Sequence, residues 1–131
     1  MRVLIVDDSE TTRRLLRAIA GSRQWVICGE ADCGLTGIEK YEALQPELVL
    51  IDLAMPDMNG IEVGKRMSEI NGKVPLVLFT VLDVEGLEAA AHRAGICQVI
   101  SKAQVWSLIQ GIENVVNQSP ELERQTPDIS E

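Results

Sequence analysis

Short apolar runs alternate with longer segments of helical spacing along most of the chain. The runs are rich in Val, Ile and Leu, and they predict strands at Arg2–Val6, Trp25–Glu30, Leu48–Asp52, Leu76–Thr80 and Gln98–Ser101. Three stretches within them are apolar at every position: Val3–Val6, Leu48–Ile51 and Leu76–Phe79. Such continuity is typical of parallel strands that are covered on both faces.

The segments between these runs predict five helices. The first follows Ser9, a good N-capping residue, and carries Leu15, Leu16 and Ile19 before it ends at Gly21. The other four are predicted at Leu35–Leu44, Ile61–Ile70, Val84–Arg93 and Val105–Val116, with Gly60, Gly72 and Gly95 as breakers. Strands that alternate with helices predict an α/β fold, here a single doubly wound parallel sheet of five strands.

Composition and periodicity together predict one folded domain. The length of 131 residues and the hydrophobic content of 46% are sufficient for a sheet that is covered on both faces. From Asn117 onward the apolar periodicity stops, and acidic residues, Pro and Ser accumulate. We therefore predict a domain over residues 1–117 and a disordered acidic tail, or the stub of a linker, over residues 118–131.

The overall charge is acidic and argues against a nucleic-acid partner. The formal net charge is −8, whereas binding of phosphates requires an excess or a stripe of Lys and Arg. Arg13, Arg14 and Arg17 form only a local cluster, and a solvated helix face is its simplest interpretation. We expect no direct binding of nucleic acid by this chain.

The cysteines and the lengths of the apolar runs bear on the compartment. Cys28, Cys33 and Cys97 are odd in number and lack the spacing of metal ligands. No charged leader precedes the domain, and no apolar run has the length of a membrane span. The sequence predicts a reducing, cytoplasmic setting without a membrane contact, and thiols that are buried or half-buried.

Polar residues gather where the predicted strands end. Asp7 and Asp8 follow the first strand, and Asp52 closes the third. Thr80 closes the fourth strand, and Lys102 follows the fifth. Because the carboxyl ends of parallel strands meet at one edge of a sheet, these side chains are expected on one rim. Three converging carboxylates repel one another, and a hard divalent cation, Mg²⁺ or else Mn²⁺, relieves that repulsion.

This rim predicts phosphoryl transfer. A carboxylate can attack a phosphoryl donor and form an acyl phosphate, and Asp52 is the residue placed for that role. The hydroxyl of Thr80 and the ammonium of Lys102 can supply a hydrogen bond and a point charge to the phosphoryl oxygens.

Four stretches lie at these strand ends in order: Val6–Ser9, Asp52–Gly60, Phe79–Thr80 and Ile100–Lys102. Together they resemble the receiver domain of bacterial two-component response regulators, and the similarity covers residues 1–117. The resemblance implies a flavodoxin-like sheet with strand order 2-1-3-4-5. It also implies a signalling domain of a phosphorelay that catalyses only its own phosphorylation and dephosphorylation.

The resemblance implies roles for four residues of the acidic rim. Asp52 is the phosphoacceptor, and a sensor histidine kinase or a phosphotransfer protein is the donor. Asp8 is a direct Mg²⁺ ligand, while Asp7 acts largely through water. The backbone carbonyl of Ala54 is a further ligand of the metal.

The resemblance also implies a switch, and there the chain departs from the family pattern. Thr80 and Lys102 contact the phosphoryl group and couple it to a conformational change. Val99 stands where receivers carry an aromatic residue that swings inward, and Ala103 stands where a proline follows the lysine. Val81 replaces a small residue and crowds the phosphoryl site. We therefore expect weak transmission through the fifth strand.

Partners are expected on two faces. By resemblance the first helix docks the phosphodonor, and its basic cluster either steers an acidic partner or is only solvated. Cys28–Gly34 and Gln45–Asp52 resemble receivers that precede a helix-turn-helix output domain, so an output protein or domain outside this chain is expected. A homodimer contact is expected through Val84–Arg93, Gln98–Ser101 and Val105–Val116, where Trp106 is either an exposed anchor or buried packing.

Two other classes of function remain open. One is an interaction module that is insensitive to phosphorylation; the missing aromatic switch favours it and the complete acidic pocket opposes it. The other is a phosphohydrolase of the haloacid dehalogenase kind, which also uses an Asp nucleophile with Mg²⁺. Such enzymes need a second acid two residues after the nucleophile, and Ala54 stands there, so turnover is expected to be poor.

Overall fold

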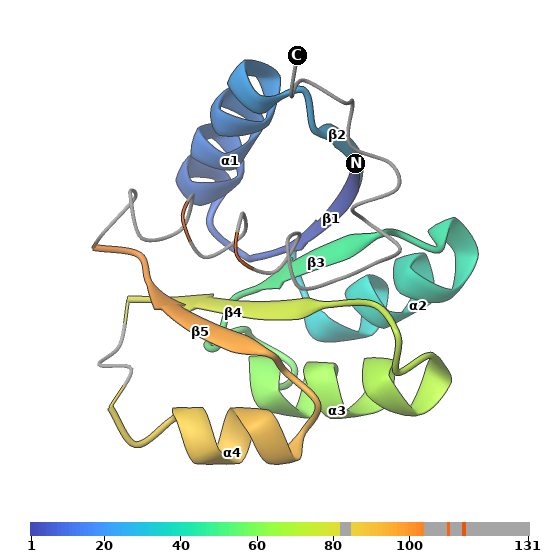
Figure 1. Cartoon of the computed structure of the whole chain (residues 1–131), viewed down its shortest axis with the longest axis vertical. Coiled ribbons are helices and arrows are strands. Elements are labelled where there is room, and N and C mark those ends of the chain that lie inside the picture. The colour runs from blue at the N-terminus through green and yellow to red at the C-terminus, as the bar shows by residue number, and fades with distance from the viewer. Residues whose placement is uncertain (82–84, 104–109, 111–113, 115–131) are drawn as a thin grey trace.

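A computed structural model describes residues 1–81 and 85–103, together with residues 110 and 114. Within them strands and helices alternate, as the hydrophobic pattern predicts (Figure 1). The strands are β1 (Arg2–Val6), β2 (Val26–Ala31), β3 (Leu48–Ile51), β4 (Leu76–Thr80) and β5 (Gln98–Ser101). The helices are α1 (Glu10–Arg23), α2 (Gly34–Leu44), α3 (Gly60–Ile70) and α4 (Glu88–Arg93).

The five strands form one parallel sheet in the order β2-β1-β3-β4-β5. Helix α1 covers one face of the sheet, and α2, α3 and α4 cover the other (Figure 1). The predicted fold class, a doubly wound flavodoxin-like sheet with strand order 2-1-3-4-5, is confirmed. Of the five predicted helices, the one at Val105–Val116 lies outside the described residues except for positions 110 and 114, and Trp106 and the predicted tail at residues 118–131 lie wholly outside them.

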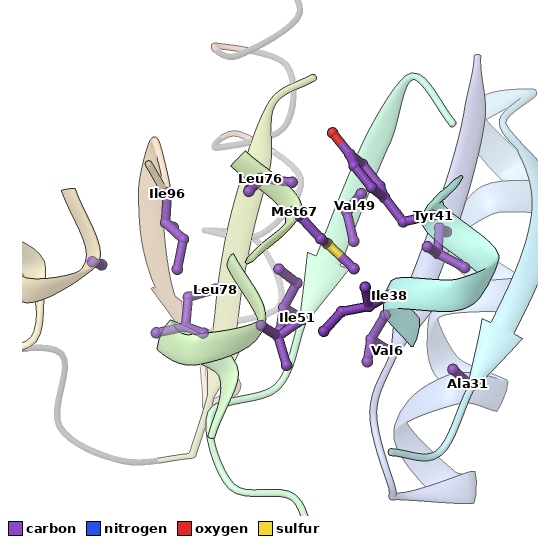
Figure 2. Close-up of a cluster of buried hydrophobic side chains, with 13 residues drawn as sticks. Val6, Ala31, Ile38, Tyr41, Val49, Ile51, Met67, Leu76, Leu78 and Ile96 are labelled. Carbon is purple, nitrogen blue, oxygen red and sulfur yellow. The ribbon is translucent and has the colours of Figure 1, made fainter. Parts of the chain in front are cut away.

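The central strands β1, β3 and β4 each contain an unbroken apolar run, because their two faces contribute to two separate cores. Successive side chains of a strand point to opposite faces, so Val3 and Ile5 pack beneath α1 while Leu4 and Val6 pack on the other side. The larger core lies between the sheet and α2, α3 and α4 (Figure 2). Tyr41 belongs to this core, and its hydroxyl donates a hydrogen bond to the carbonyl of Asn71 at 2.7 Å.

Two predicted helix ends were wrong. Helix α1 does not stop at Gly21 but continues to Arg23. The next residue, Gln24, ends the helix in a left-handed conformation with φ 62°. A single glycine costs a helix about 1 kcal/mol, and the burial of Ile19 and Ala20 against the sheet carries the helix past it. Residues 85–87 form a turn instead of helix, because Gly86 has φ 85°, so α4 begins at Glu88 rather than Val84.

Smaller differences, of one residue each, occur at five other ends. Strand β2 lies one residue further along than predicted, and β3 ends at Ile51, which leaves Asp52 just beyond the ladder. Helices α2 and α3 each begin one residue early, at Gly34 and Gly60, so Gly60 starts a helix rather than breaking one. Where an element ends depends on its last hydrogen bond, which hydrophobic periodicity does not report.

The thiols follow the prediction at two of three positions. Cys28 and Cys33 are half-buried, whereas Cys97 is exposed in the short connection that leads into β5. The backbone N–H of Cys97 donates to the carbonyl of Leu76, which holds this connection beside the start of β4. In the part of the chain that the structure describes, no helix has both the length and the apolar character that a membrane crossing requires.

Candidate functional site

The candidate site lies at the carboxyl edge of the sheet, where the ladder hydrogen bonds continue past the strands. The N–H of Asp52 donates to the carbonyl of Val6 at 2.8 Å, which sets the end of β3 beside the end of β1. The N–H of Lys102 donates to the carbonyl of Thr80 at 2.7 Å and does the same for β5 and β4. The side chains that follow these strands therefore share one rim.

Three carboxylates meet on this rim. Asp7, Asp8 and Asp52 each offer an oxygen, and these oxygens all lie within 4.8 Å of one another. Asp7 is 2% exposed and Asp52 is 5% exposed, whereas Asp8 is open to solvent. The structure thus combines two buried acids with one that faces water, and the cluster can be reached from outside.

The ammonium of Lys102 reaches the same cluster. Its Nζ lies 2.8 Å from Oδ2 of Asp7 and 3.3 Å from Oδ1 of Asp52. The side chain also passes near Phe79, with Nζ 5.8 Å from the centre of the ring. One positive charge therefore faces two buried negative charges, and it compensates them only in part.

The imbalance is visible in the pKa of Asp52, which is raised from 3.8 to about 6. Burial of the carboxyl group is the largest cause, and the neighbouring charge of Asp7 acts in the same direction. Lys102 opposes this shift, and Asp8 adds to it slightly. The ionised form of Asp52 is thus less favoured than that of a carboxylate in water.

The donor set fits a hard divalent cation. One oxygen of Asp7 accepts a hydrogen bond from the N–H of Ser9 at 2.9 Å. The other oxygen, Oδ2, is buried, and among the described residues its one polar contact is the Lys102 ammonium. Carboxylate oxygens at this spacing suit Mg²⁺, which prefers oxygen ligands and retains several waters. Ala54 follows two residues after Asp52 in an exposed loop.

The residues expected to form the switch lie in β4 and β5 or directly after them. Thr80 is 1% exposed at the end of β4, and its strand partner in β5 is Ser101. Val99 pairs with Leu78 and packs, half-buried, against the larger core. Val81, which directly follows Thr80, is 72% exposed.

Sequence reasoning missed the close approach at Gly60. A Cβ on Gly60 would lie 2.2 Å from the backbone oxygen of Asp52, and the N–H of Gly60 donates to the carbonyl of Leu53 at 2.8 Å. Asn59 caps α3 by accepting a hydrogen bond from the N–H of Glu62 at 2.9 Å. Only glycine fits here, and the Asn-Gly pair was the one signal for it in the sequence.

The basic cluster of α1 is compensated within the domain. Glu10 pairs with Arg14 at 3.4 Å and with Arg17 at 3.0 Å, and Glu30 of β2 pairs with Arg13 at 3.2 Å and with Arg17 at 2.6 Å. Arg13 also donates a hydrogen bond to the backbone carbonyl of Asp7 at 2.6 Å. The cluster is thus a local ion-pair network that ties α1 to β2 and to the site, a function that charge patterning did not predict.

Comparison with known proteins identifies the family. The model of the response regulator receiver domain matches residues 3–113. The chemotaxis protein CheY of Thermotoga maritima is 34% identical over 101 residues, which are 77% of this chain and 84% of that protein. CheY of Halobacterium salinarum is 34% identical over 88% of this chain and 96% of its own length. The chain belongs to the response regulator receiver family.

Solved structures agree with this assignment. The response regulator domain of Thermotoga maritima CheB has a TM-score of 0.76 and 28% identity, over 97% of this chain and 98% of that one. CheY in the CheX-CheY-BeF3-Mg complex of Borrelia burgdorferi has a TM-score of 0.78 and 27% identity. That match covers 86% of this chain and 88% of the other. Phosphorylation of an aspartate is characteristic of this family, and its receiver domains interact with kinases and output domains.

Other relatives are longer than this chain. The protein-glutamate methylesterase/protein-glutamine glutaminase of Treponema denticola is 34% identical over 78% of this chain, but the match covers only 28% of that enzyme. The similarity is therefore confined to one part of that protein.

Proposed function

We propose that the chain receives a phosphoryl group on Asp52 from a sensor histidine kinase or a phosphotransfer protein and then changes its contacts with an output partner. The observation that carries the proposal is the position of Asp52. Asp52 is 5% exposed and directly follows a central strand, and its carboxylate lies within 4.8 Å of two further acids and 3.3 Å from the Lys102 ammonium. That setting combines a nucleophile with groups that can stabilise negative charge on the transferring phosphoryl group.

In the proposed step an oxygen of Asp52 forms a bond to phosphorus. The bond between phosphorus and the imidazole nitrogen of the donor histidine breaks, and its electron pair stays on that nitrogen. Asp7, Asp8, Asp52 and the backbone carbonyl of Ala54 would hold Mg²⁺. The ion would neutralise negative charge on the cluster and on the transferring oxygens.

Lys102 and Thr80 act after the transfer, when they contact the phosphoryl group on Asp52. Phosphorylation of Asp52 removes one of the two carboxylates that the Lys102 ammonium contacts in this structure. The ammonium then pairs with a phosphoryl oxygen, and the hydroxyl of Thr80 donates a hydrogen bond to another. Both residues lie at the ends of neighbouring strands, so the state of Asp52 is linked to β4 and β5.

The direct test is treatment with acetyl phosphate and Mg²⁺ followed by intact mass spectrometry. The wild-type chain is expected to gain one phosphoryl mass, and Asp52→Asn is expected to gain none. Asp32→Asn removes an exposed acid outside the cluster and serves as the matched control, with labelling like that of the wild type. Equal labelling of Asp52→Asn would show that the nucleophile is another residue.

A second candidate function is an interaction module that does not respond to phosphorylation, and Val99 is the observation that favours it. Its side chain packs against the larger core and is too small to sweep the volume of an aromatic ring. Under this alternative Asp52 is labelled but partner binding does not change. For either function we further propose an output partner or output domain that is not part of residues 1–117, a cytoplasmic setting, and no binding of nucleic acid or membrane by these residues. The domain limits 1–117 are part of the same proposal.

A further inference from the structure

The carboxylate of Asp57 joins two parts of the domain that are distant in the sequence. Asp57 lies in the loop between β3 and α3, three residues after Ala54. Its Oδ1 accepts a hydrogen bond from the N–H of Gly34 at 2.8 Å, and its Oδ2 accepts one from Leu35, also at 2.8 Å. Both donors belong to the first turn of α2, so the loop is anchored to the start of that helix.

Helix α2 lacks the local cap that a helix start ordinarily has. Cys33 occupies the N-cap position with extended backbone angles, φ −152° and ψ 164°, but its side chain makes no capping hydrogen bond. Its thiol contacts the hydroxyl of Thr36 at 3.2 Å instead. The N–H groups at a helix start need acceptors, and Asp57 supplies them from elsewhere in the chain. These N–H groups also lower the pKa of Asp57.

Close packing at the same place reinforces the link. A Cβ on Gly34 would lie 2.5 Å from Cγ of Met58 and 2.8 Å from a methyl carbon of Val63, so the helix start sits directly against the loop. At the end where the loop enters α3, Gly60 lies directly against the backbone oxygen of Asp52. The segment 53–56 therefore runs between the end of β3 and the anchor at Asp57, with Leu53 and Met55 packed against the larger core.

We propose that Asp57 is a positioning residue of the cation site, which holds the segment carrying Asp52 and the Ala54 carbonyl in the shape that binds a divalent cation. This inference rests on the proposed function, because it takes that edge of the sheet as the cation site. Asp57 itself touches neither the cation nor the phosphoryl group. Without its two hydrogen bonds the segment samples more conformations, and cation binding must then order it.

The experiment separates positioning of the loop from capping of the helix. Binding of Mn²⁺ is followed by electron paramagnetic resonance, and the denaturation midpoint in urea is measured on the same variants. For Asp57→Ala we expect affinity for Mn²⁺ to fall about 10-fold, as for the loss of a partner outside the ligand shell. The midpoint is also expected to fall, because α2 loses its acceptors.

The double variant Cys33→Ser/Asp57→Ala gives the decisive comparison. Serine in the N-cap position supplies an acceptor to α2 from within the helix start, without any bond to the loop. We expect this second substitution to restore the midpoint but not the affinity for Mn²⁺. In a wild-type background Cys33→Ser leaves both unchanged. Asp32→Ala, which removes an exposed charge close to the same helix start, is the control for electrostatics alone and should bind Mn²⁺ as the wild type does.

Two results would overturn the inference: wild-type affinity for Mn²⁺ in Asp57→Ala, or recovery of both quantities in the double variant. The second result would make Asp57 a cap of α2 and no more. Asp8→Ala separates these failures from failure of the cation site itself. If Asp8→Ala loses Mn²⁺ binding while Asp57→Ala retains it, the site is correct and only the positioning role is wrong. If Asp8→Ala binds Mn²⁺ normally, the site assignment fails first.

Discussion

The ammonium of Lys102 lies 2.8 Å from Oδ2 of Asp7, although the two residues come from opposite ends of the domain. Asp7 is 2% exposed, and its Oδ2 has no other polar contact among the described residues. The lysine therefore acts as a counter-ion to the buried carboxylate of Asp7. A divalent cation bound to the acidic cluster would compete with the ammonium for the same carboxylates.

Substitution of this lysine should expose that competition. Lys102→Met leaves Asp7 and Asp52 without their cation, and we expect the free energy of unfolding to fall by at most about 3 kcal/mol near pH 8. Saturating Mg²⁺ should restore most of the loss, and the affinity for Mg²⁺ should increase. Urea denaturation with and without Mg²⁺ measures both effects. Lys65→Met, at an exposed position of α3, is the control. If Lys102→Met loses the same free energy of unfolding with and without Mg²⁺, the lysine and the cation do not compete for the same carboxylates.

The raised pKa of Asp52 predicts a pH-dependent stability. A carboxyl whose pKa rises from 3.8 to about 6 on folding binds its proton more tightly in the folded state. Its contribution to stability is thus fully present below about pH 4 and is lost as the pH rises through about 6. Asp52→Asn has no such group, and its free energy of unfolding should exceed that of the wild type by up to about 3 kcal/mol above about pH 7.

Urea denaturation from acid to neutral pH, in the absence of divalent cations, measures this difference. The gap between Asp52→Asn and the wild type should narrow steadily as the pH falls below about 6. A gap that stays constant across the whole range would show that the gain comes from packing rather than from the buried charge.

The two glycines Gly60 and Gly21 should respond to alanine in opposite ways. Gly60→Ala places a Cβ 2.2 Å from the backbone oxygen of Asp52, and we expect a loss of stability of about 1–3 kcal/mol together with weaker labelling by a phosphodonor. Gly21 lies inside α1, and a Cβ added to it would meet nothing within 4 Å, so Gly21→Ala should stabilise by up to about 1 kcal/mol. Thermal unfolding of both variants measures these two changes in stability. If Gly60→Ala is more stable than the wild type, the close approach of Gly60 to the backbone oxygen of Asp52 is wrong.

Val99 predicts how the phosphorylated state differs from the free one. Its half-buried side chain already packs in the larger core, and valine cannot fill the volume that an aromatic ring would take. We expect beryllofluoride with Mg²⁺ to change amide exchange little in residues 98–101 and more in residues 81–85. Hydrogen exchange with mass spectrometry gives the comparison. Large protection changes centred on Val99, with none after Thr80, would show that a full switch operates without the ring.

Most of the fold was predictable because its determinants are local in the sequence. The apolar runs of β1, β3 and β4 and the helical spacing between them indicated the elements, and the sheet contains those strands. The ends of α1 and α4 were predicted wrongly, because packing of Ile19 and Ala20 outweighed one glycine while Gly86 adopted a turn. Local propensities of this size are small compared with the burial of a helix face.

The sequence by itself determined which side chains stand at the strand ends, since strand length and alternation assign each of them a place on one rim. It did not determine their pairing. The ion pair of Lys102 with Asp7, the compensation of Arg17 by Glu30 and the cap that Asp57 provides to α2 all join segments distant in the sequence. Only the tertiary structure decided these contacts, because they depend on how the completed sheet brings its loops and helix starts together.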